Sequence, residues 1–378
     1  MVFRYALHGR LNAAQAESLS FKLSYSYEQM SSCRYDESSH EVVVELDDPD
    51  HAPALATIVE KLIESSLKER QIGKRVICET EKMEANVLGS VQRPVFDGMR
   101  YEGAALAIFE AVDARLARLA DGYASERRRY SASISLETME KCNYVSYFPQ
   151  NLYMISEIPH QYDALQQIKA TGDYRQHARL GERALTPAVC FHCYEEFSDS
   201  IVDQPVVISS AGHCFRHEAT WRKSSYRLKE FQMREIVYLG DEQTVSELRS
   251  AIMTEVWTLF CELGLTGRIE TAADPFYYPQ DNPMAFHQIM AEMKYELVAQ
   301  TGDEQFSIAS FNHVHDSLTR QFRITDRSRQ PVHSGCVAFG VDRWVYLLLC
   351  EYGPDLDEWP DRVKHILAAG GVQDYAIQ

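Results

Sequence analysis

The sequence predicts an α+β fold made of a small N-terminal part and a larger part behind it. The first eighty or so residues give the order strand, helix, strand, strand, helix, strand, which is typical of a ferredoxin-like unit. Further along, strands and long helices mix without an internal repeat, which predicts a second α+β unit. A chain of 378 residues is long enough for about two domains. We therefore expect a ferredoxin-like domain over 1–82, a linker over 83–104 and a main domain over 105–378.

The elements of the N-terminal part follow from periodicity and capping. Alternating apolar residues over 2–7 predict a strand, and Asn12 can cap a helix that runs to residue 23. An acidic, proline-containing turn starts a second helix. Two further strands are expected at 33–35 and 42–46, the second helix at 47–67, and a fourth strand at 75–78.

The main part begins after a stretch with little periodicity that contains glycine and proline breaks. Beyond it, apolar residues spaced by three and four predict amphipathic helices. These helices are expected at 105–119, after Thr244 and, as an apolar helix, at 344–349.

Composition places the chain among ordinary globular proteins. Hydrophobic residues make up 45% and charged residues 25%, which argues against a disordered, collagen-like or disulfide-rich protein. No apolar run approaches the roughly 20 residues of a membrane-spanning helix, and the first ten residues lack a signal-peptide core. We therefore expect a cytoplasmic protein with no membrane partner. The net charge of -17 argues against a dominant nucleic-acid surface but leaves a local basic patch open.

Two neighbouring stretches carry residue types suited to nucleotide chemistry. Residues 214–218 read CFRHE and residues 227–235 read RLKEFQMRE. An arginine on a rigid strand can bind a phosphate through its planar fork, and a phenylalanine on the next strand can stack on a base. The alternative is an amphipathic hairpin with surface ion pairs.

Another segment, residues 335–344, reads GCVAFGVDRW and precedes an apolar helix. Its glycines allow close approach of the backbone, and Arg343 falls in the first helical turn. Together with the two stretches above, it resembles motifs 2 and 3 of class II aminoacyl-tRNA synthetases. The strand around Ser310 and Asn312 also resembles one of seryl-tRNA synthetases. The proline expected in motif 1 is missing from 128–135.

The resemblance implies a fold and an ATP site. The fold is an antiparallel sheet flanked by helices. The candidate catalytic residues are Arg216, which would hold the α-phosphate, and Arg343, which would hold the γ-phosphate. Phe231 and Arg343 would lie on either side of the adenine, with Glu218 at the adenine or amino-group edge and Arg227 on the returning strand. Mg²⁺ would bridge the phosphates of ATP.

Three residues at the matching motif edges are candidates for metal ligands. Cys190 ends the segment LTPAVC, Glu235 ends motif 2, and Cys336 lies just inside motif 3. Two thiolates and a carboxylate suit Zn²⁺, with a fourth position left open. Cys193 competes with Cys190, since C-x-x-C can itself bind metal. The alternative for each cysteine is a small buried residue.

A Cys, Glu and Cys set in these places resembles the atypical, zinc-dependent seryl-tRNA synthetases of methanogens and their bacterial relatives, the amino acid:carrier protein ligases. In that group one zinc ion per subunit holds the α-amino group of the substrate. The resemblance places Asp274 and, less specifically, Lys294 in the amino acid pocket. It places Ala338 where a small residue limits or permits side-chain room. By chemistry alone, Asp274 can also be a turn residue before Pro275, and Lys294 part of a solvated helix face.

These features predict ATP-dependent activation of a small α-amino acid as its adenylate. Transfer to the phosphopantetheine thiol of an acyl or peptidyl carrier protein is favoured over transfer to tRNA, because only about eighty N-terminal residues remain for an RNA-binding module. An atypical seryl-tRNA synthetase and a non-catalytic synthetase paralogue stay as alternatives. The resemblance also implies a homodimer. A basic patch for an acidic carrier is expected at 126–130, with Arg320 and Arg323 as weaker candidates.

Overall fold

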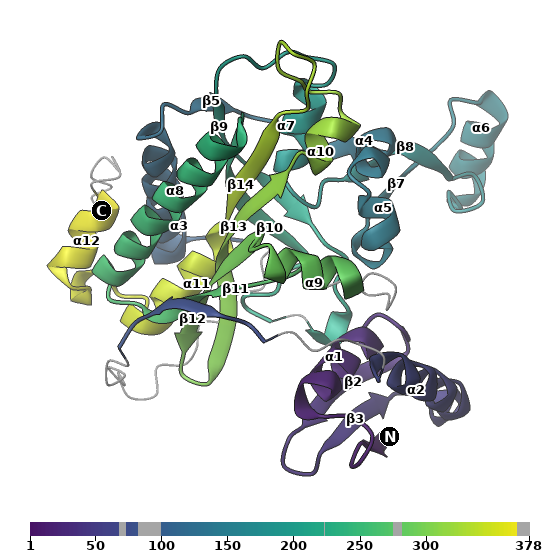
Figure 1. The fold of residues 1–378 in the computed structure, drawn as a ribbon. Coiled ribbons are helices and arrows are strands. Elements are labelled where there is room, and N and C mark those ends of the chain that lie inside the picture. The colour runs from purple at the N-terminus through teal and green to yellow at the C-terminus, as the bar shows by residue number, and fades with distance from the viewer. Residues whose placement is uncertain (68–72, 82–99, 223, 275–281, 369–378) are drawn as a thin grey trace.

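The computed structural model describes residues 1–67, 73–81, 100–222, 224–274 and 282–368. Within these ranges the chain forms one eight-stranded sheet and two three-stranded sheets, with helices packed around them (Figure 1). The α+β class predicted from the sequence is confirmed. No helix in the described ranges is long and apolar enough to cross a membrane.

The N-terminal unit is a three-stranded sheet packed against two helices. Its elements are β1 (Val2–Ala6), α1 (Ala13–Leu23), β2 (Met30–Asp36), β3 (Glu41–Leu46), the short turn η1 (Pro49–His51) and α2 (Ala52–Ser66). Asn12 caps α1 as predicted, because its side chain accepts a hydrogen bond from the backbone N–H of Gln15 at 2.9 Å. Apolar side chains from both helices and from β3 form the core of this unit.

The fourth strand expected in this unit lies elsewhere. β4 (Val76–Glu79) pairs with β11 (Thr266–Thr271) of the large sheet, where Cys78 lies opposite Ile269. The N-terminal sheet therefore has three strands, and the prediction of a four-stranded ferredoxin-like sheet is wrong on this point. Periodicity identifies a strand but not its partner, and the edge of β11 offers backbone groups that β4 satisfies. The linker expected over 83–104 falls mostly on residues outside the described ranges.

The large sheet is the frame of the main unit. Its strand order is β4-β11-β12-β13-β14-β10-β9-β5, and neighbours are antiparallel except β5 with β9. Its other strands are β5 (Glu126–Arg128), β9 (Val206–Phe215), β10 (Glu230–Gly240), β12 (Lys294–Thr301), β13 (Glu304–His315) and β14 (His333–Gly340). The strands β9, β10 and β14 therefore lie side by side, and their side chains alternate between the two faces.

One face of the sheet is covered by long helices (Figure 1). These are α3 (Gly103–Asp121), α8 (Glu242–Glu262), α11 (Val341–Tyr352) and, packed on α3, α12 (Asp361–Ala368). Ile236 and Val337 of the sheet contribute to the core on this face, together with Val256 and Trp344 of the helices. The helices expected at 105–119, after Thr244 and at 344–349 are present, each with somewhat different ends.

The other face of the sheet carries smaller elements and a second core. They are β6 (Ser133–Ser135), α4 (Leu136–Lys141), α5 (Tyr144–Tyr147), η2 (Pro149–Asn151), β7 (Met154–Glu157), α6 (Tyr162–Thr171), β8 (Arg179–Leu185), α7 (Cys190–Glu196), η3 (Thr220–Arg222), α9 (Asn282–Met290) and α10 (Ser317–Gln321). The short turn η5 (Leu356–Glu358) instead connects α11 to α12, and its Leu356 packs against the first core. The strands β6, β8 and β7 form the remaining sheet. Cys190, Val237 and Cys336 belong to the core on this face, which includes the candidate site.

Gly335 fixes how closely β14 approaches its neighbours. A Cβ atom there would lie 2.3 Å from the backbone oxygen of Asn312 and 2.4 Å from the ring of Tyr238. We expect Gly335→Ala to lower the free energy of unfolding by about 2–3 kcal/mol, because backbone and ring must both shift. Chemical denaturation measures this loss. Gly73→Ala is the control, since nothing lies within 4 Å of its added Cβ, and equal stability of the two variants would contradict the prediction.

Candidate active site and metal centre

The site is built on three adjacent strands. Phe231 and Glu235 lie four residues apart on β10 and therefore point to the same face of the sheet. On β14, Ala338 lies opposite Glu235, and Cys336 lies two residues before it on the same face. Arg216 directly follows β9, where its backbone N–H bonds the carbonyl of Lys229. The motif residues named from the sequence thus meet on one surface.

Two of the arginines are held by backbone carbonyls rather than by carboxylates. Arg216 donates from Nε and Nη2 to the oxygen of Pro187 at 3.3 and 3.2 Å, and its guanidinium carbon lies 5.2 Å from the centre of the Phe231 ring. Arg343 donates to the carbonyl oxygens of Tyr226 and Ser307 at 2.9 and 2.6 Å. These contacts orient both side chains and leave their positive charge available to an anion.

The arginines also act on one another. Burial, followed by the positive charges of Arg227 and Arg216, lowers the pKa of Arg343 to about 10. A guanidinium whose charge is disfavoured by neighbouring cations gains stability when an anion binds among them. The cluster is therefore suited to a polyphosphate.

Glu218 is a buried carboxylate that joins two parts of the chain. Arg227 donates to its Oε1 at 3.0 Å, and the hydroxyl of Tyr25 donates to its Oε2 at 2.9 Å. Burial alone would raise the pKa of Glu218, but Arg227, Arg222 and Tyr25 hold that pKa below its ordinary value. The carboxylate is thus ionised and fixed in direction by a residue of the N-terminal unit.

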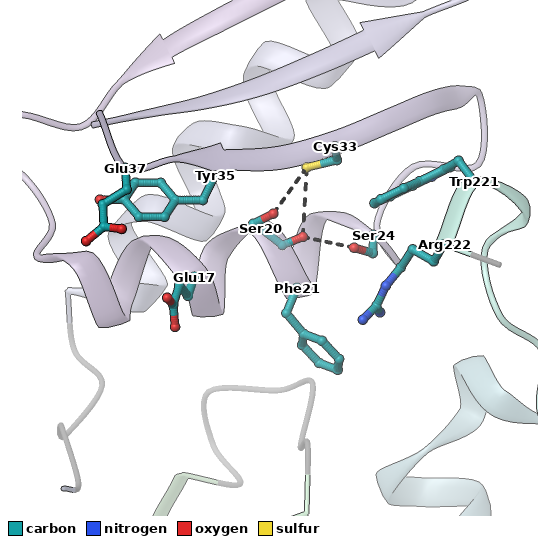
Figure 2. A pocket seen from close by; sticks show the side chains of 9 residues that line it. All are labelled: Glu17, Ser20, Phe21, Ser24, Cys33, Tyr35, Glu37, Trp221 and Arg222. Atoms are coloured by element: carbon teal, nitrogen blue, oxygen red, sulfur yellow. Dashed lines mark hydrogen bonds between the residues drawn. The ribbon is translucent and has the colours of Figure 1, made fainter. Parts of the chain in front are cut away.

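The contact between the two units extends beyond this hydrogen bond. The guanidinium of Arg222 lies 5.0 Å from the ring centre of Phe21 and 5.3 Å from that of Tyr25, both on α1 or just after it. Trp221 packs against the core of the N-terminal unit. A cavity of about 440 Å³ lies beside these residues. Figure 2 shows the side chains that line it, from α1, β2 and the segment that carries Trp221. The N-terminal unit therefore supports the loop between β9 and β10.

The three candidate metal ligands lie together. The Sγ atoms of Cys190 and Cys336 and a carboxylate oxygen of Glu235 are within 4.8 Å of one another, and all three residues are buried. Cys190 begins α7, which brings it over β10 and β14. Cys193 is also buried, one turn further along the same helix, but it is not a member of this cluster.

The donor set fits a metal ion. Among the residues described, Glu235 Oε2 is buried without a hydrogen-bond partner, which is costly unless a further partner is present when the protein works. Burial raises the pKa of Glu235 to about 7. Asn312 donates from Nδ2 toward Cys336 Sγ at 3.4 Å, so this sulfur is also oriented by a neighbouring side chain. Two soft thiolates with one carboxylate are typical of a Zn²⁺ site with an open position.

A second group of polar residues, centred on Asp274, lies near Arg216. Lys294 donates to Asp274 Oδ1 at 2.7 Å and forms an ion pair with Glu296 at 3.2 Å. Gln288 bonds the backbone and the side chain of Asp274 at 2.8 and 2.9 Å. The negative charge of Asp274 also raises the pKa of Arg216, in opposition to burial. The rest of the segment predicted to accompany Asp274, residues 275–281, lies outside the described residues.

Some supporting residues were not identified from the sequence. Asp342 is buried and accepts hydrogen bonds from the hydroxyl of Tyr101 and from the backbone N–H of Gln232 at 2.6 Å. It thereby ties the start of α11 to β10, next to Phe231. Tyr25 and Gln288 are two further partners that lie far from the motifs in sequence. No local pattern marks them, because their role depends on long-range contacts.

The fold and the site define the core of a class II aminoacyl-tRNA synthetase. The profile of the tRNA synthetase class II core domain (G, H, P, S and T) matches residues 174–352. The chain is also similar to the M. kandleri seryl-tRNA synthetase in its crystal structure with A. aeolicus tRNASec. That match has a TM-score of 0.68 and covers 97% of this chain and 77% of the other, at 18% sequence identity.

Relatives similar in sequence define the family more narrowly than the structural match does. Amino acid–acyl-carrier-protein ligase 1 of Bradyrhizobium diazoefficiens is 30% identical over 297 residues, which are 75% of this chain and 90% of the relative. The type-2 serine–tRNA ligase of Methanopyrus kandleri is 25% identical over 285 residues, 68% of this chain and 54% of that enzyme. The chain belongs to the amino acid–acyl-carrier-protein ligase family, which confirms the resemblance drawn from the motifs.

The raised pKa of Glu235 predicts how stability changes with pH in metal-free protein. A carboxyl with a pKa near 7 when folded and near 4.3 when unfolded favours folding at low pH. This contribution is lost as pH rises through about 7, and its full size is roughly 3.5–4 kcal/mol. We expect the difference in unfolding free energy between the wild type and Glu235→Gln, measured by denaturation with a chelator, to fall as pH rises from about 5 to 8.

Zinc should reverse this trend, because a metal ion binds the ionised carboxylate and thiolates and so gains affinity as pH rises. A difference that stays flat across this pH range in chelator would contradict the assignment of the raised pKa to Glu235.

Proposed function

We propose that the protein activates a small α-amino acid with ATP and transfers it to the phosphopantetheine thiol of a carrier protein. The observation that carries the proposal is the meeting of two chemistries on one face of the sheet. A cluster of arginines suited to polyphosphate lies beside a Cys, Glu and Cys cluster suited to a metal ion. The relatives named as amino acid–acyl-carrier-protein ligases support the choice of acceptor.

In the first step the substrate carboxylate attacks the α-phosphorus of ATP, which forms the aminoacyl adenylate and releases pyrophosphate. Arg216 would neutralise charge at the α-phosphate, and Arg343 would bind the γ-phosphate. Phe231, already in contact with Arg216, offers a face for the adenine, and Glu218 would accept from the adenine amino group. Mg²⁺ would accompany ATP as phosphate counter-charge. The step depends on positioning and charge neutralisation and needs no protein base.

The amino acid would bind between the metal ligands and the Asp274 pair. Zn²⁺ held by Cys190, Glu235 and Cys336 would supply an open coordination position for a neutral amino group, which selects α-amino acids over plain acids. Ala338 lies opposite Glu235 in the sheet, so its small side chain leaves room beside the metal ligands for the substrate. Glycine, alanine and serine are the substrates we expect.

In the second step the carrier thiol attacks the adenylate carbonyl, and a thioester forms as AMP leaves. The basic segment 126–130 was the sequence candidate for carrier docking, but Arg127 pairs with Asp121 and Arg128 with Glu196. This segment therefore offers less free positive charge than its sequence suggests. We propose a homodimer by analogy with the class. Transfer to tRNA is the second candidate, supported by the match to type-2 serine–tRNA ligases.

Amino-acid-dependent ATP–pyrophosphate exchange tests the proposal. We expect exchange on zinc-loaded protein with one or two small amino acids in the absence of any acceptor, and thioester formation once a phosphopantetheinylated carrier protein is added. Cys336→Ser should reduce exchange at least about 100-fold, because a mispositioned substrate loses most of the gain from orientation. Aminoacylation of tRNA in preference to the carrier would move the assignment to the second candidate. No exchange with any amino acid would contradict the proposal.

Tyr25 should affect ATP affinity although it belongs to the N-terminal unit. Tyr25→Phe removes one hydrogen bond to the ionised Glu218, and such bonds contribute about 1.5–3 kcal/mol. We expect the KM for ATP in the exchange assay to rise about 10-fold or more, with little change in the KM for the amino acid. Tyr27→Phe is the matched control, because the hydroxyl of Tyr27 bonds His51 within the N-terminal unit. Equal effects of the two variants would mean that Tyr25 has only a structural role.

A further inference from the structure

A second group of metal-binding side chains lies on the opposite face of the large sheet. His313 and His315 lie near the end of β13, and His333 begins β14. Asn312 points toward Cys336, so His313, the next residue on the strand, points away from the Cys190 cluster. The three histidines are therefore separate from the site proposed for catalysis and lie on the face covered by α8.

Their geometry is close to that of a metal site. The Nδ1 atom of His333 lies 3.5 Å from the Nε2 atom of His313. Two nitrogen ligands of a tetrahedral Zn²⁺ ion, each about 2.0–2.1 Å from the metal, are about 3.3–3.4 Å apart. The ring of His315 stacks on that of His313, and the ligand nitrogens of all three lie within 4.8 Å of one another. A modest rotation of the half-buried His315 would complete a three-nitrogen set.

The protonation state suits ligation. Burial, and then the positive charges of His315 and Arg249, lower the pKa of His313 to about 4. Burial also lowers the pKa of His315. Both imidazoles are thus neutral near pH 7 and offer a lone pair, which is the form that binds metal ions.

The surroundings offer access from solvent and place a carboxylate in the same cavity. A cavity of about 420 Å³ opens between α8, the turn after α9 and β13, and it is lined by His313, His315 and Glu242. The carboxylate of Glu242, the first residue of α8, favours positive charge on His315. Arg249 is the opposing charge in the cavity. Its guanidinium donates to the carbonyl of Glu292 at 2.6 Å.

We propose that His313, His315 and His333 form a second metal site, which binds a divalent transition metal such as Zn²⁺ or Co²⁺, with Glu242 as the candidate fourth ligand. Three imidazoles with a carboxylate favour these ions over Mg²⁺ and Ca²⁺. The ion joins β13, β14 and the first turn of α8, on the side of the sheet away from the Cys190 cluster. The site does not depend on the proposed function, because its ligands take no part in that chemistry.

Zinc stoichiometry on the full chain tests the site. Protein is dialysed against buffered free Zn²⁺, and bound metal is measured by plasma mass spectrometry. We expect two ions per wild-type chain and one in His333→Asn and His315→Asn, with affinity for the second ion reduced at least about 10-fold. His287→Asn is the matched control, because this exposed histidine lies near His315 but outside the cluster, and it should keep two ions.

Cobalt spectra on the unmodified protein separate the two sites without relying on a variant that folds. Co²⁺ in the Cys190 and Cys336 site gives thiolate charge-transfer absorption, whereas Co²⁺ bound by imidazoles gives only visible ligand-field bands. We expect the wild-type protein loaded with Co²⁺ to show both signals, one for each site.

Each unexpected result of these metal-binding experiments bears differently on the two sites. One ion per wild-type chain with a thiolate spectrum alone would overturn the histidine site and leave the proposed function intact. Two ions that persist in both histidine variants would also overturn it. A single ion with only ligand-field bands would support the histidine site and count against the cysteine site.

Discussion

The pairing of β10 with both β9 and β14 is the constraint on which the rest of the site depends. Antiparallel register places Ala338 opposite Glu235 and carries Phe231 on the same face. The intervening residues, such as Ile236, enter the core beneath α8 and α11. A slip of one residue would exchange the two sets, moving the carboxylate among the aliphatic side chains beneath α8 and α11 and moving those side chains into the site. The chemistry of the site and the stability of the sheet therefore require the same register.

Much of this arrangement can be predicted from the sequence, because strand alternation and short motifs are local properties. The motif edges predict Cys190, Glu235 and Cys336 as candidate ligands, and the fold brings them together. Local patterns do not reveal which elements pair or pack with one another. β4 was placed in the N-terminal sheet, and the contact between Tyr25 and Glu218 joins residues 193 positions apart. Such pairings depend on how the two units pack together, and a short stretch of sequence cannot predict this.

The electrostatics of the site are unfavourable in the protein alone. Burial and then neighbouring cations lower the pKa of Arg343, and burial raises that of Glu235. Each group is held in surroundings that disfavour its charged form, and each would be relieved by a ligand of opposite charge. Stability is thus given up at the residues that would bind substrate and metal, as is common at functional sites.

The position of β4 has a consequence for how the chain can be divided. Although β4 precedes the main unit in sequence, it covers the edge of β11, and Lys74 just before it pairs with the buried Glu270. An exposed edge strand invites pairing with other chains and aggregation. A truncated protein that starts after residue 82 would uncover this edge, whereas one that starts at about residue 73 would keep it covered. A truncation that removes the N-terminal unit and keeps the large sheet intact should therefore start before β4.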